Sequence, residues 1–154
     1  MALFERLPPS LAKVVFNLWP CYRRSGARVV EIDRDWRRLR VRLPLSVGTR
    51  NYVGSIFGGS MFAAVDPIYM LMLIKNLGPD YVVWDKSAQI RFRRPARDTL
   101  TAEFALTSLE LDEIREELRT KDALERTYAV ELTDLSGVVC ARVEKVIHVS
   151  RRAR

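Results

Sequence analysis

The sequence predicts an α+β fold in which one antiparallel β-sheet wraps around a single long, buried α-helix. The stretch between Gly58 and Gly78 is apolar on almost every side, which is typical of a helix that protein covers all round. Segments before and after it alternate apolar and polar residues with the period of a β-strand. The chain of 154 residues fits one domain with a sizeable core. We therefore expect a single domain over residues 1–154.

A short amphipathic helix is predicted near the N-terminus, over residues 10–20. Ser10 can cap its first turn, and the helix ends near Trp19-Pro20. Its apolar side fits either a membrane-surface or lid helix, or a helix laid over the edge of a sheet. The second interpretation is favoured, because Phe16 and Trp19 widen the apolar side instead of completing a basic amphipathic pattern.

Two half-buried antiparallel strands are predicted next, at residues 29–33 and 37–43. The second strand places apolar side chains on one face and arginines on the other: Leu39, Val41 and Leu43 against Arg38, Arg40 and Arg42. The arginine row fits a phosphate-binding strip or the solvated outer face of a sheet. The solvated face is favoured, because an antiparallel sheet with one wet side gives the same pattern.

The central helix is bounded by Gly58-Gly59 at its start and by Gly78-Pro79 at its end. Its length of about 18 residues could nearly cross a bilayer core. Asp66-Pro67 at its centre argues against a membrane span, because a carboxylate at mid-bilayer is costly and no positive-inside asymmetry accompanies it. We expect a core helix and no transmembrane segment.

Beyond this helix, residues 82–93 are predicted to form a long strand that ends before Pro95. One of its faces is expected to carry Trp84, Ala88, Ile90 and Phe92. Further alternating segments begin at Leu100, Tyr128 and Val138, and an exposed amphipathic helix at 110–122 is inserted between them. These strands are expected to form a meander. One helix cannot fill both faces of such a sheet and free edges invite pairing, so we expect a homodimer, possibly a homotetramer.

The charge balance favours anionic partners without saying which ones. Lys and Arg number 26 against 19 Asp and Glu, a net charge of +7. A nucleic-acid recognition motif is missing and the aromatic residues alternate into the core, so nucleic acid is not an expected partner. His148 is the single histidine and has no Cys, Asp or second His near it in sequence, so no metal site is predicted.

The cysteines and the N-terminus favour a cytoplasmic protein. Cys21 and Cys140 are too far apart for a metal-binding spacing, and both are expected to be buried thiols. Glu5 and Pro8-Pro9 interrupt the pattern of a signal peptide. A basic tail is predicted at residues 150–154.

A spaced motif starts at Asn51 and continues into the central helix. The glycine pair follows Asn51 after six residues, and an aspartate follows the pair after six more: Asn51, Gly58, Gly59 and Asp66. With this motif the chain resembles the hotdog-fold acyl-CoA thioesterases, especially the phenylacetate-pathway (PaaI-like) branch, in which a histidine stands where Phe57 stands here. Residues 94–96 and 99–102 also resemble that branch. Because of Phe57 and the inserted helix, the chain is similar above all to an uncharacterised thioesterase-like hotdog group.

The residues allow a thioesterase mechanism to be argued. The amide of Gly59 lies at the positive end of a helix dipole, where it can hold a thioester carbonyl oxygen as charge develops on it. Asp66 lies about two turns further on, too far along one helix to act at the same carbonyl. The resemblance implies composite sites at a dimer interface, with Gly59 from one protomer and Asp66 from the other. Asp66 is then nucleophile or general base, and Asn51 orients water or substrate.

The same resemblance implies where the substrate binds. Phe57 and Gly58 are expected beside the thioester, and the CoA phosphates on Arg91, Arg93 and Arg94. No cofactor is expected, because coenzyme A is part of the substrate. The alternative function is a non-catalytic acyl-CoA or fatty-acyl-binding hotdog protein, in which Phe57 and Pro67 have replaced working parts. Asp66 also has a purely structural interpretation, as a helix carboxylate that caps or pairs beside Pro67.

Overall fold

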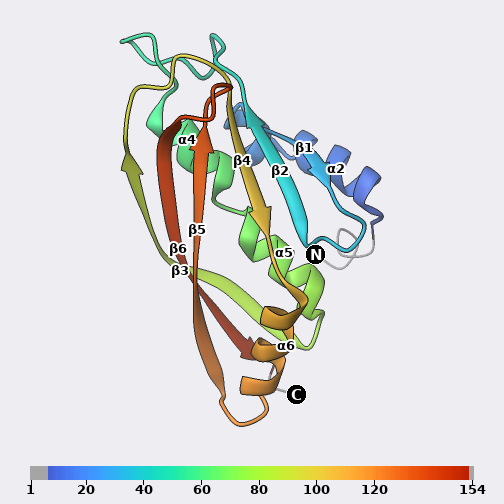
Figure 1. Cartoon of the computed structure of the whole chain (residues 1–154). Coiled ribbons are helices and arrows are strands. Elements are labelled where there is room, and N and C mark those ends of the chain that lie inside the picture. The colour runs from blue at the N-terminus through green and yellow to red at the C-terminus, as the bar shows by residue number, and fades with distance from the viewer. Residues whose placement is uncertain (1–6, 153–154) are drawn as a thin grey trace.

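The computed structural model describes residues 7–152, which form one six-stranded antiparallel sheet and its covering helices. The helices are α2 (Pro9–Leu18), α3 (Pro20–Arg24), α4 (Gly58–Val65), α5 (Ile68–Leu77) and α6 (Ser108–Glu117). The strands are β1 (Arg28–Ile32), β2 (Arg38–Leu43), β3 (Tyr81–Phe92), β4 (Leu100–Ala105), β5 (Ala123–Thr133) and β6 (Val139–Arg151). Helices α4 and α5 follow one another along one face of the sheet (Figure 1). The predicted fold class is confirmed.

The strand order corrects the predicted meander. The sheet runs β1-β2-β4-β5-β6-β3, so β3 pairs with the last strand of the chain and not with β4. The helix that follows β2 carries the chain across the sheet to its far edge, and β4 then returns to pair with β2. Local alternation shows that a segment is a strand but not which strand lies beside it.

A β-bulge in β3 corrects the predicted inner face of that strand. Asp85 pairs with Ile147 and Ser87 with Val146, so Lys86 is an extra residue. One extra residue reverses the alternation of side chains along a strand. Trp84 therefore does not share a face with Ala88, Ile90 and Phe92. Its ring stacks on His148 with the centroids 4.5 Å apart, and Asp85 turns to the inner face instead.

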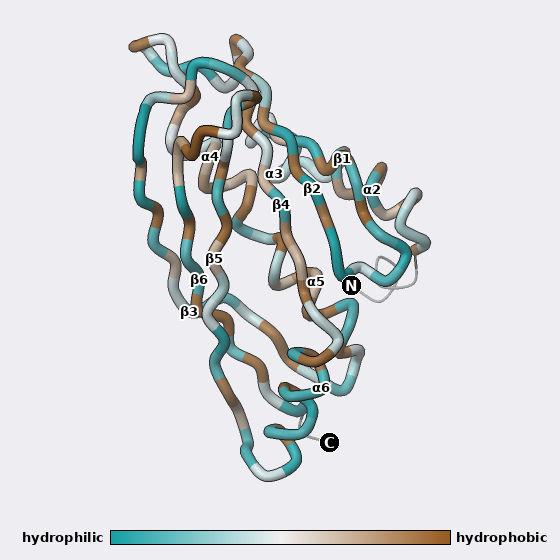
Figure 2. The backbone as a smooth tube through the Cα atoms, viewed as in Figure 1, coloured by the Kyte–Doolittle hydropathy of each residue, from teal (hydrophilic) through white to brown (hydrophobic). Residues whose placement is uncertain are grey.

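The core lies between the sheet and the central helix. Inward positions of β2 and β4 are buried, and the hydrophobic and hydrophilic residues alternate along the strands (Figure 2). Arg40 lies on the outer face, paired with Glu31 at 3.0 Å and Glu103 at 3.2 Å, as expected for a solvated sheet face. By length and composition residues 58–77 could cross a membrane, but the segment packs as the core helix.

Helix α2 lies over the edge of β1, as the favoured interpretation predicts. The Asn17 side chain donates to the Val29 carbonyl at 2.8 Å and accepts from the Val29 amide at 2.7 Å. The helix begins at Pro9 with Pro8 in the cap position, so the prediction that Ser10 caps it is wrong. A proline at the first position already has the backbone angle that a helix requires, and it leaves one N–H fewer to satisfy at this end.

The structure corrects two further predictions, one on Cys21 and one on the basic tail. Cys140 is buried but Cys21 is exposed, because it lies on the outer side of the short helix α3. The predicted basic tail starts too early, since β6 continues to Arg151, which pairs with Tyr81. Residues 153–154 lie outside the described part of the chain.

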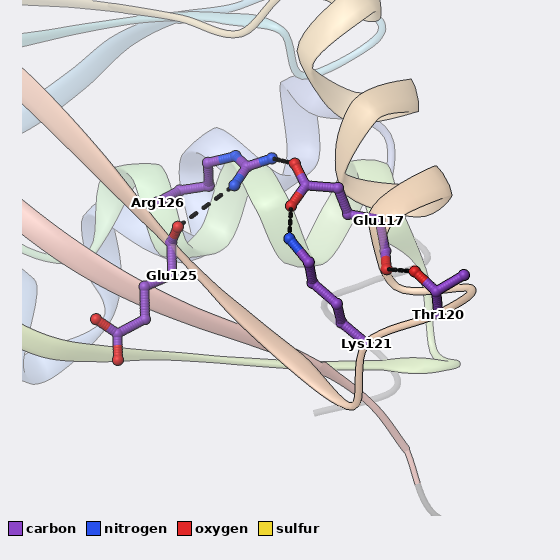
Figure 3. A network of polar contacts seen from close by, with 5 residues as sticks. All are labelled: Glu117, Thr120, Lys121, Glu125 and Arg126. Carbon is purple, nitrogen blue, oxygen red and sulfur yellow. Dashed lines mark hydrogen bonds and ion pairs between the residues drawn. The ribbon is translucent and has the colours of Figure 1, made fainter.

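The inserted helix α6 is tied to the sheet at its C-terminal end. The Thr107 hydroxyl caps its start by accepting from the amide of Glu110 at 3.1 Å. At its other end, Glu117 binds Lys121 at 2.8 Å and Arg126 of β5 at 2.5 Å (Figure 3). These two cations hold the pKa of Glu117 below its usual value. The network fixes α6 against β5 but contains none of the predicted site residues.

Candidate functional site

A buried lysine joins two carboxylates beneath the sheet. Lys145 of β6 points inward, and its side chain is 1% exposed. Its Nζ donates to Asp66 Oδ1 at 2.8 Å and to Asp85 Oδ2 at 2.7 Å. It also donates to the backbone carbonyl of Asp66. We call these three residues the Asp66–Lys145–Asp85 cluster.

Local backbone features place both carboxylates. Asp66 lies between α4 and α5, where Pro67 has no N–H and interrupts the helical hydrogen bonds. Carbonyls at such a break need other donors. The Tyr22 hydroxyl donates to the Ala64 carbonyl at 3.0 Å, and Lys145 donates to that of Asp66. Asp85 reaches the same lysine because the bulge at Lys86 turns it inward.

The two carboxylates differ in their surroundings. The Asp66 side chain is 44% exposed and that of Asp85 is 25% exposed. Within residues 7–152, Asp85 Oδ1 is buried and has no hydrogen-bond partner. Burial raises the pKa of Asp85, the nearby Lys145 opposes this rise, and Asp66 adds to it. The cluster therefore has one inner carboxyl group with a raised pKa, Asp85, and one outer carboxyl group that is more exposed to solvent, Asp66.

The glycine pair lies between two aromatic rings. A Cβ atom on Gly58 would lie 2.7 Å from Phe92 Cζ, and one on Gly59 would overlap the Phe57 ring. Phe57 occupies the cap position of α4 without a side-chain hydrogen bond to the helix amides. Both rings are 57% exposed. The two rings lie directly against the glycines, and the start of the helix has an apolar, partly exposed border.

Asn51 holds its own loop. Its Oδ1 accepts from the amides of Val53 and Ser55, each at 3.1 Å, and its Nδ2 donates to the Ser55 hydroxyl at 3.0 Å. This closes the loop that leads into Phe57, whose amide donates to the Thr49 carbonyl at 2.7 Å. In this structure Asn51 fixes the entry to α4, and no hydrogen bond joins it to the cluster among the described residues.

The arginines lie on the outer face of the sheet, opposite to the cluster. Arg91 and Arg93 line an open hollow of about 290 Å³ together with Gln89, Arg142 and Glu144. Arg94 is exposed beyond the end of β3, where its amide donates to the Cys140 carbonyl at 3.3 Å. Two of the three predicted arginines therefore share one hollow, and Arg94 does not line it.

Comparison with protein families gives a match over residues 10–149, to the family described as "Domain of unknown function (DUF4442)". The chain belongs to the DUF4442 family. The match spans the helix α2, the central helix and nearly all of the sheet. A comparison with curated protein sequences gives no match.

Solved structures show the same fold at low sequence identity. A Pseudomonas aeruginosa protein of unknown function, described as a probable thioesterase, has a TM-score of 0.84 at 23% identity, with 95% of this chain and 97% of that chain covered. A Chlorobaculum tepidum protein of unknown function has 0.75 at 13%, covering 95% and 98%. A Haemophilus influenzae thioesterase has 0.65 at 14%, covering 88% and 85%. These likenesses confirm the predicted hotdog fold.

In this DUF4442 chain the predicted residues fall into separate groups, and β3 connects two of them. Phe92 at one end of the strand contacts Gly58, and Asp85 further back belongs to the cluster with Asp66. Asn51 stabilises the loop beside the glycines, while the arginines occupy the other face. The glycine region and the carboxylate region are thus two ends of one surface along β3.

Two residues of the cluster were missed from the sequence. Lys145 occupies an inward position between Val143 and Ile147, where the alternation requires an apolar side chain. A charge there needs a buried partner, and Asp66 is the other charge at an apolar position. Pairing these two exceptions would have found the contact. Asp85 gave no such signal, because the bulge that turns it inward is not visible in the alternation.

Proposed function

We propose that this protein hydrolyses an acyl-CoA or related thioester at a site completed by a second copy of the chain. One observation carries the proposal: the Asp66 carboxylate lies at the break of the central helix, is held by a buried ammonium and remains 44% exposed. A carboxylate that is fixed in place but open to solvent can meet a substrate or water. The thioesterases among its structural neighbours make the thioester the leading substrate class.

The chemistry requires a base or nucleophile and an oxyanion donor. Asp66 either attacks the thioester carbonyl carbon or removes a proton from the attacking water. The carbonyl oxygen takes up negative charge, which the Gly59 amide of the other copy stabilises. The carbon–sulfur bond then breaks. On the base route, the water oxygen stays on the acyl carbon as the carboxylic acid, and the proton that Asp66 took from water passes to the thiolate. On the nucleophile route, an acyl–Asp66 anhydride forms, a water molecule hydrolyses it to the carboxylic acid and a protonated Asp66, and that proton passes to the thiolate. Asn51 supports this by holding the loop that positions Phe57 and the glycines.

The free edge of β3 supports a homodimer. This strand pairs with β6 on one side and ends the sheet on the other. Its inner face is incompletely covered: Ala88 and Phe92 are exposed, although Lys145 and Ala141 opposite them are buried. Strand pairing across this edge would cover the apolar residues and bring Gly59 of one copy towards Asp66 of the other. Two such dimers could form a tetramer.

The surfaces suggest how a thioester would bind. The acyl group would lie against Phe57 and Phe92 beside the glycines, where the exposed surface is apolar. The phosphates of coenzyme A would bind Arg91 and Arg93, with Arg94 beyond them. The substrate brings coenzyme A with it, so the reaction needs no separate cofactor. The cytoplasm, where acyl-CoA is made and used, is the proposed location.

A non-catalytic acyl-binding protein is the alternative function. The observation that favours it is the Phe57 ring, which packs directly on Gly59, the residue whose amide would hold the oxyanion. A hydrolase would need this ring to move when the substrate enters. A binding protein would keep it as part of the apolar surface.

The test is turnover of an acyl-CoA panel, followed as free thiol, for the wild type and Asp66→Asn. The variant keeps the size of the side chain and loses the base, so turnover should fall by about 10² or more while acyl-CoA binding survives. Asp122→Asn, an exposed aspartate elsewhere, is the matched control. Wild-type inactivity over the panel with binding intact would establish the binding protein instead. Phe57→His should raise the rate if the ring obstructs the oxyanion site.

A further inference from the structure

The proposed mechanism leaves the most deeply buried charge of the described chain unexplained. Lys145 is 1% exposed on a strand whose other inward residues are apolar. Apolar side chains in place of the whole cluster, the lysine together with both carboxylates, would fill the same space without removing charges from water. Stability is thus a weak reason for a lysine here, and its contacts have to account for it.

The contacts of Lys145 use all of its hydrogen-bonding capacity. An ammonium has three N–H donors. They are directed to Asp66 Oδ1, to the Asp66 carbonyl and to Asp85 Oδ2. Two of the three hold the same residue, one through its side chain and one through its backbone. One ammonium therefore fixes both the Asp66 backbone at the helix break and the orientation of the Asp66 carboxylate.

Asp85 changes the charge that Asp66 presents. Lys145 with Asp66 alone would form a neutral pair, in which the ammonium is balanced wholly by the outer carboxylate. A second carboxylate shares the ammonium, so the ionised cluster keeps one net negative charge. Asp66, the more exposed of the two carboxylates, is the one that can present this charge to a substrate.

The charge balance of the cluster depends on its own three residues. Lys145 and Asp66 are the charged groups that act on the Asp85 carboxyl. From β5, Tyr128 lies opposite Lys145 in the register and stacks on Tyr69 of α5, with centroids 4.5 Å apart. Burial raises the pKa of both phenols, so they stay neutral. Lys86 in the bulge binds Glu125 at 2.6 Å, and both side chains are half exposed.

We propose that Lys145 and Asp85 are positioning residues of the hydrolytic site: Lys145 fixes the Asp66 carboxylate, and Asp85 keeps that carboxylate from being neutralised by its own anchor. This inference rests on the proposed function. It adds two residues from β6 and β3 to a site whose motif lies in residues 51–66. It also gives the bulge at Lys86 a role, because the bulge turns Asp85 towards the lysine.

The first experiment compares kcat and KM of Asp85→Asn and Lys145→Met with the wild type. Each variant should lower kcat by about 10- to 100-fold, as expected for a lost hydrogen bond to a charged group, with KM nearly unchanged. Lys86→Met removes a charge next to Asp85 from the outer face, and Asp122→Asn removes an exposed carboxylate elsewhere; each should leave both constants unchanged. An equal change in KM, or wild-type kcat in folded Asp85→Asn, would overturn the proposal.

The second experiment needs no turnover. The Asp85 carboxyl is titrated by carbon-13 NMR in the wild type, Asp66→Asn and Lys145→Met. The wild type should show a raised pKa; removal of Asp66 should lower it, and removal of Lys145 should raise it further. If the pKa of Asp85 is the same in both variants as in the wild type, the proposed roles of Lys145 and Asp85 are wrong, even if the protein hydrolyses thioesters. If the pKa of Asp85 shifts in the expected directions but no thioester is hydrolysed, the proposed function is wrong, while the contacts of Lys145 with Asp66 and Asp85 are confirmed.

Discussion

The two edges of the sheet are finished in different ways. At β1 the chain closes its own edge: Asn17 of α2 offers an amide that both donates to and accepts from Val29, as a neighbouring strand would. At β3 no further strand follows within residues 7–152, and the inner face keeps exposed residues such as Phe92. An edge that is closed by side chains needs no partner, whereas an open apolar edge invites one.

The open edge is also the one that carries the candidate site. Asp85 and Phe92 both belong to β3, and they contact Lys145 and Gly58 respectively. The β1 edge contributes none of the predicted site residues. If β3 pairs with a second copy, assembly and site geometry depend on the same strand, while the β1 edge affects stability alone.

Assembly gives the largest expected difference between the edges. Phe92→Lys places a charge on the open edge and should weaken the dimer about 100-fold, the effect of losing an interface hot spot. Val30→Lys is the matched change at β1, where the side chain is 40% exposed, and it should leave the dimer intact. Analytical ultracentrifugation at micromolar concentration measures both. A monomeric wild type would remove the basis for a composite site.

Loss of Lys145 should give the next largest effect. Lys145→Met leaves two carboxylates together without their cation and should lower the free energy of unfolding by about 2 kcal/mol. This loss is smaller than that for a fully buried ion pair, because water reaches both carboxylates. Chemical denaturation at neutral pH and fixed protein concentration measures it. Lys86→Met should be close to neutral, because its ion pair with Glu125 is half exposed. Equal stability of the wild type and Lys145→Met would contradict the buried cluster.

Removing the hydrogen bonds between Asn17 and the β1 edge should lower the free energy of unfolding less than the loss of Lys145 does. Asn17→Ala removes both hydrogen bonds to Val29 and should lower the free energy of unfolding by about 1 kcal/mol. Amide hydrogen exchange should accelerate at Val29, with no change in turnover or dimer affinity. Ser10→Ala, an exposed change on the same helix, is the control. Loss of turnover in Asn17→Ala would show that the two edges are not independent.

The pH dependence of stability is the smallest effect and tests Asp85 by its sign. Folding raises the pKa of Asp85, so the protonated Asp85 carboxyl contributes to the stability of the fold. This contribution is fully present below the ordinary pKa of about 4 and is lost as the pH rises through the raised pKa. The wild type should therefore lose stability relative to Asp85→Asn on going from acid to neutral pH. Asp35 is the opposite case: Arg37 lowers its pKa, so its contribution is lost as pH falls. Melting curves of Asp85→Asn and Asp35→Asn over this range should diverge from the wild type in opposite directions.

Much of the fold could be predicted because local patterns reflect local burial. Every strand of the sheet was located to within a few residues, except that β5 starts at Ala123, earlier than the alternation around Tyr128 indicated. The sequence predicts one long helix with Asp66-Pro67 at its centre, and only the structure shows that the helix is interrupted there, between α4 and α5. The face of Trp84 was predicted wrongly, since one bulged residue reverses every side chain before it.

The sequence by itself left open whether Asp66 has a structural partner, but it determined the fold class, the central helix with Asp66 and Pro67 at its centre, and the glycine pair at its start. It did so because periodicity and helix-ending residues act over a few neighbouring positions. Only the tertiary structure decided that the partner is Lys145, 79 residues away, and that Asp85 joins it. That contact requires β3 to lie beside β6, and strand order depends on long-range pairing, about which the alternation within a strand carries no information.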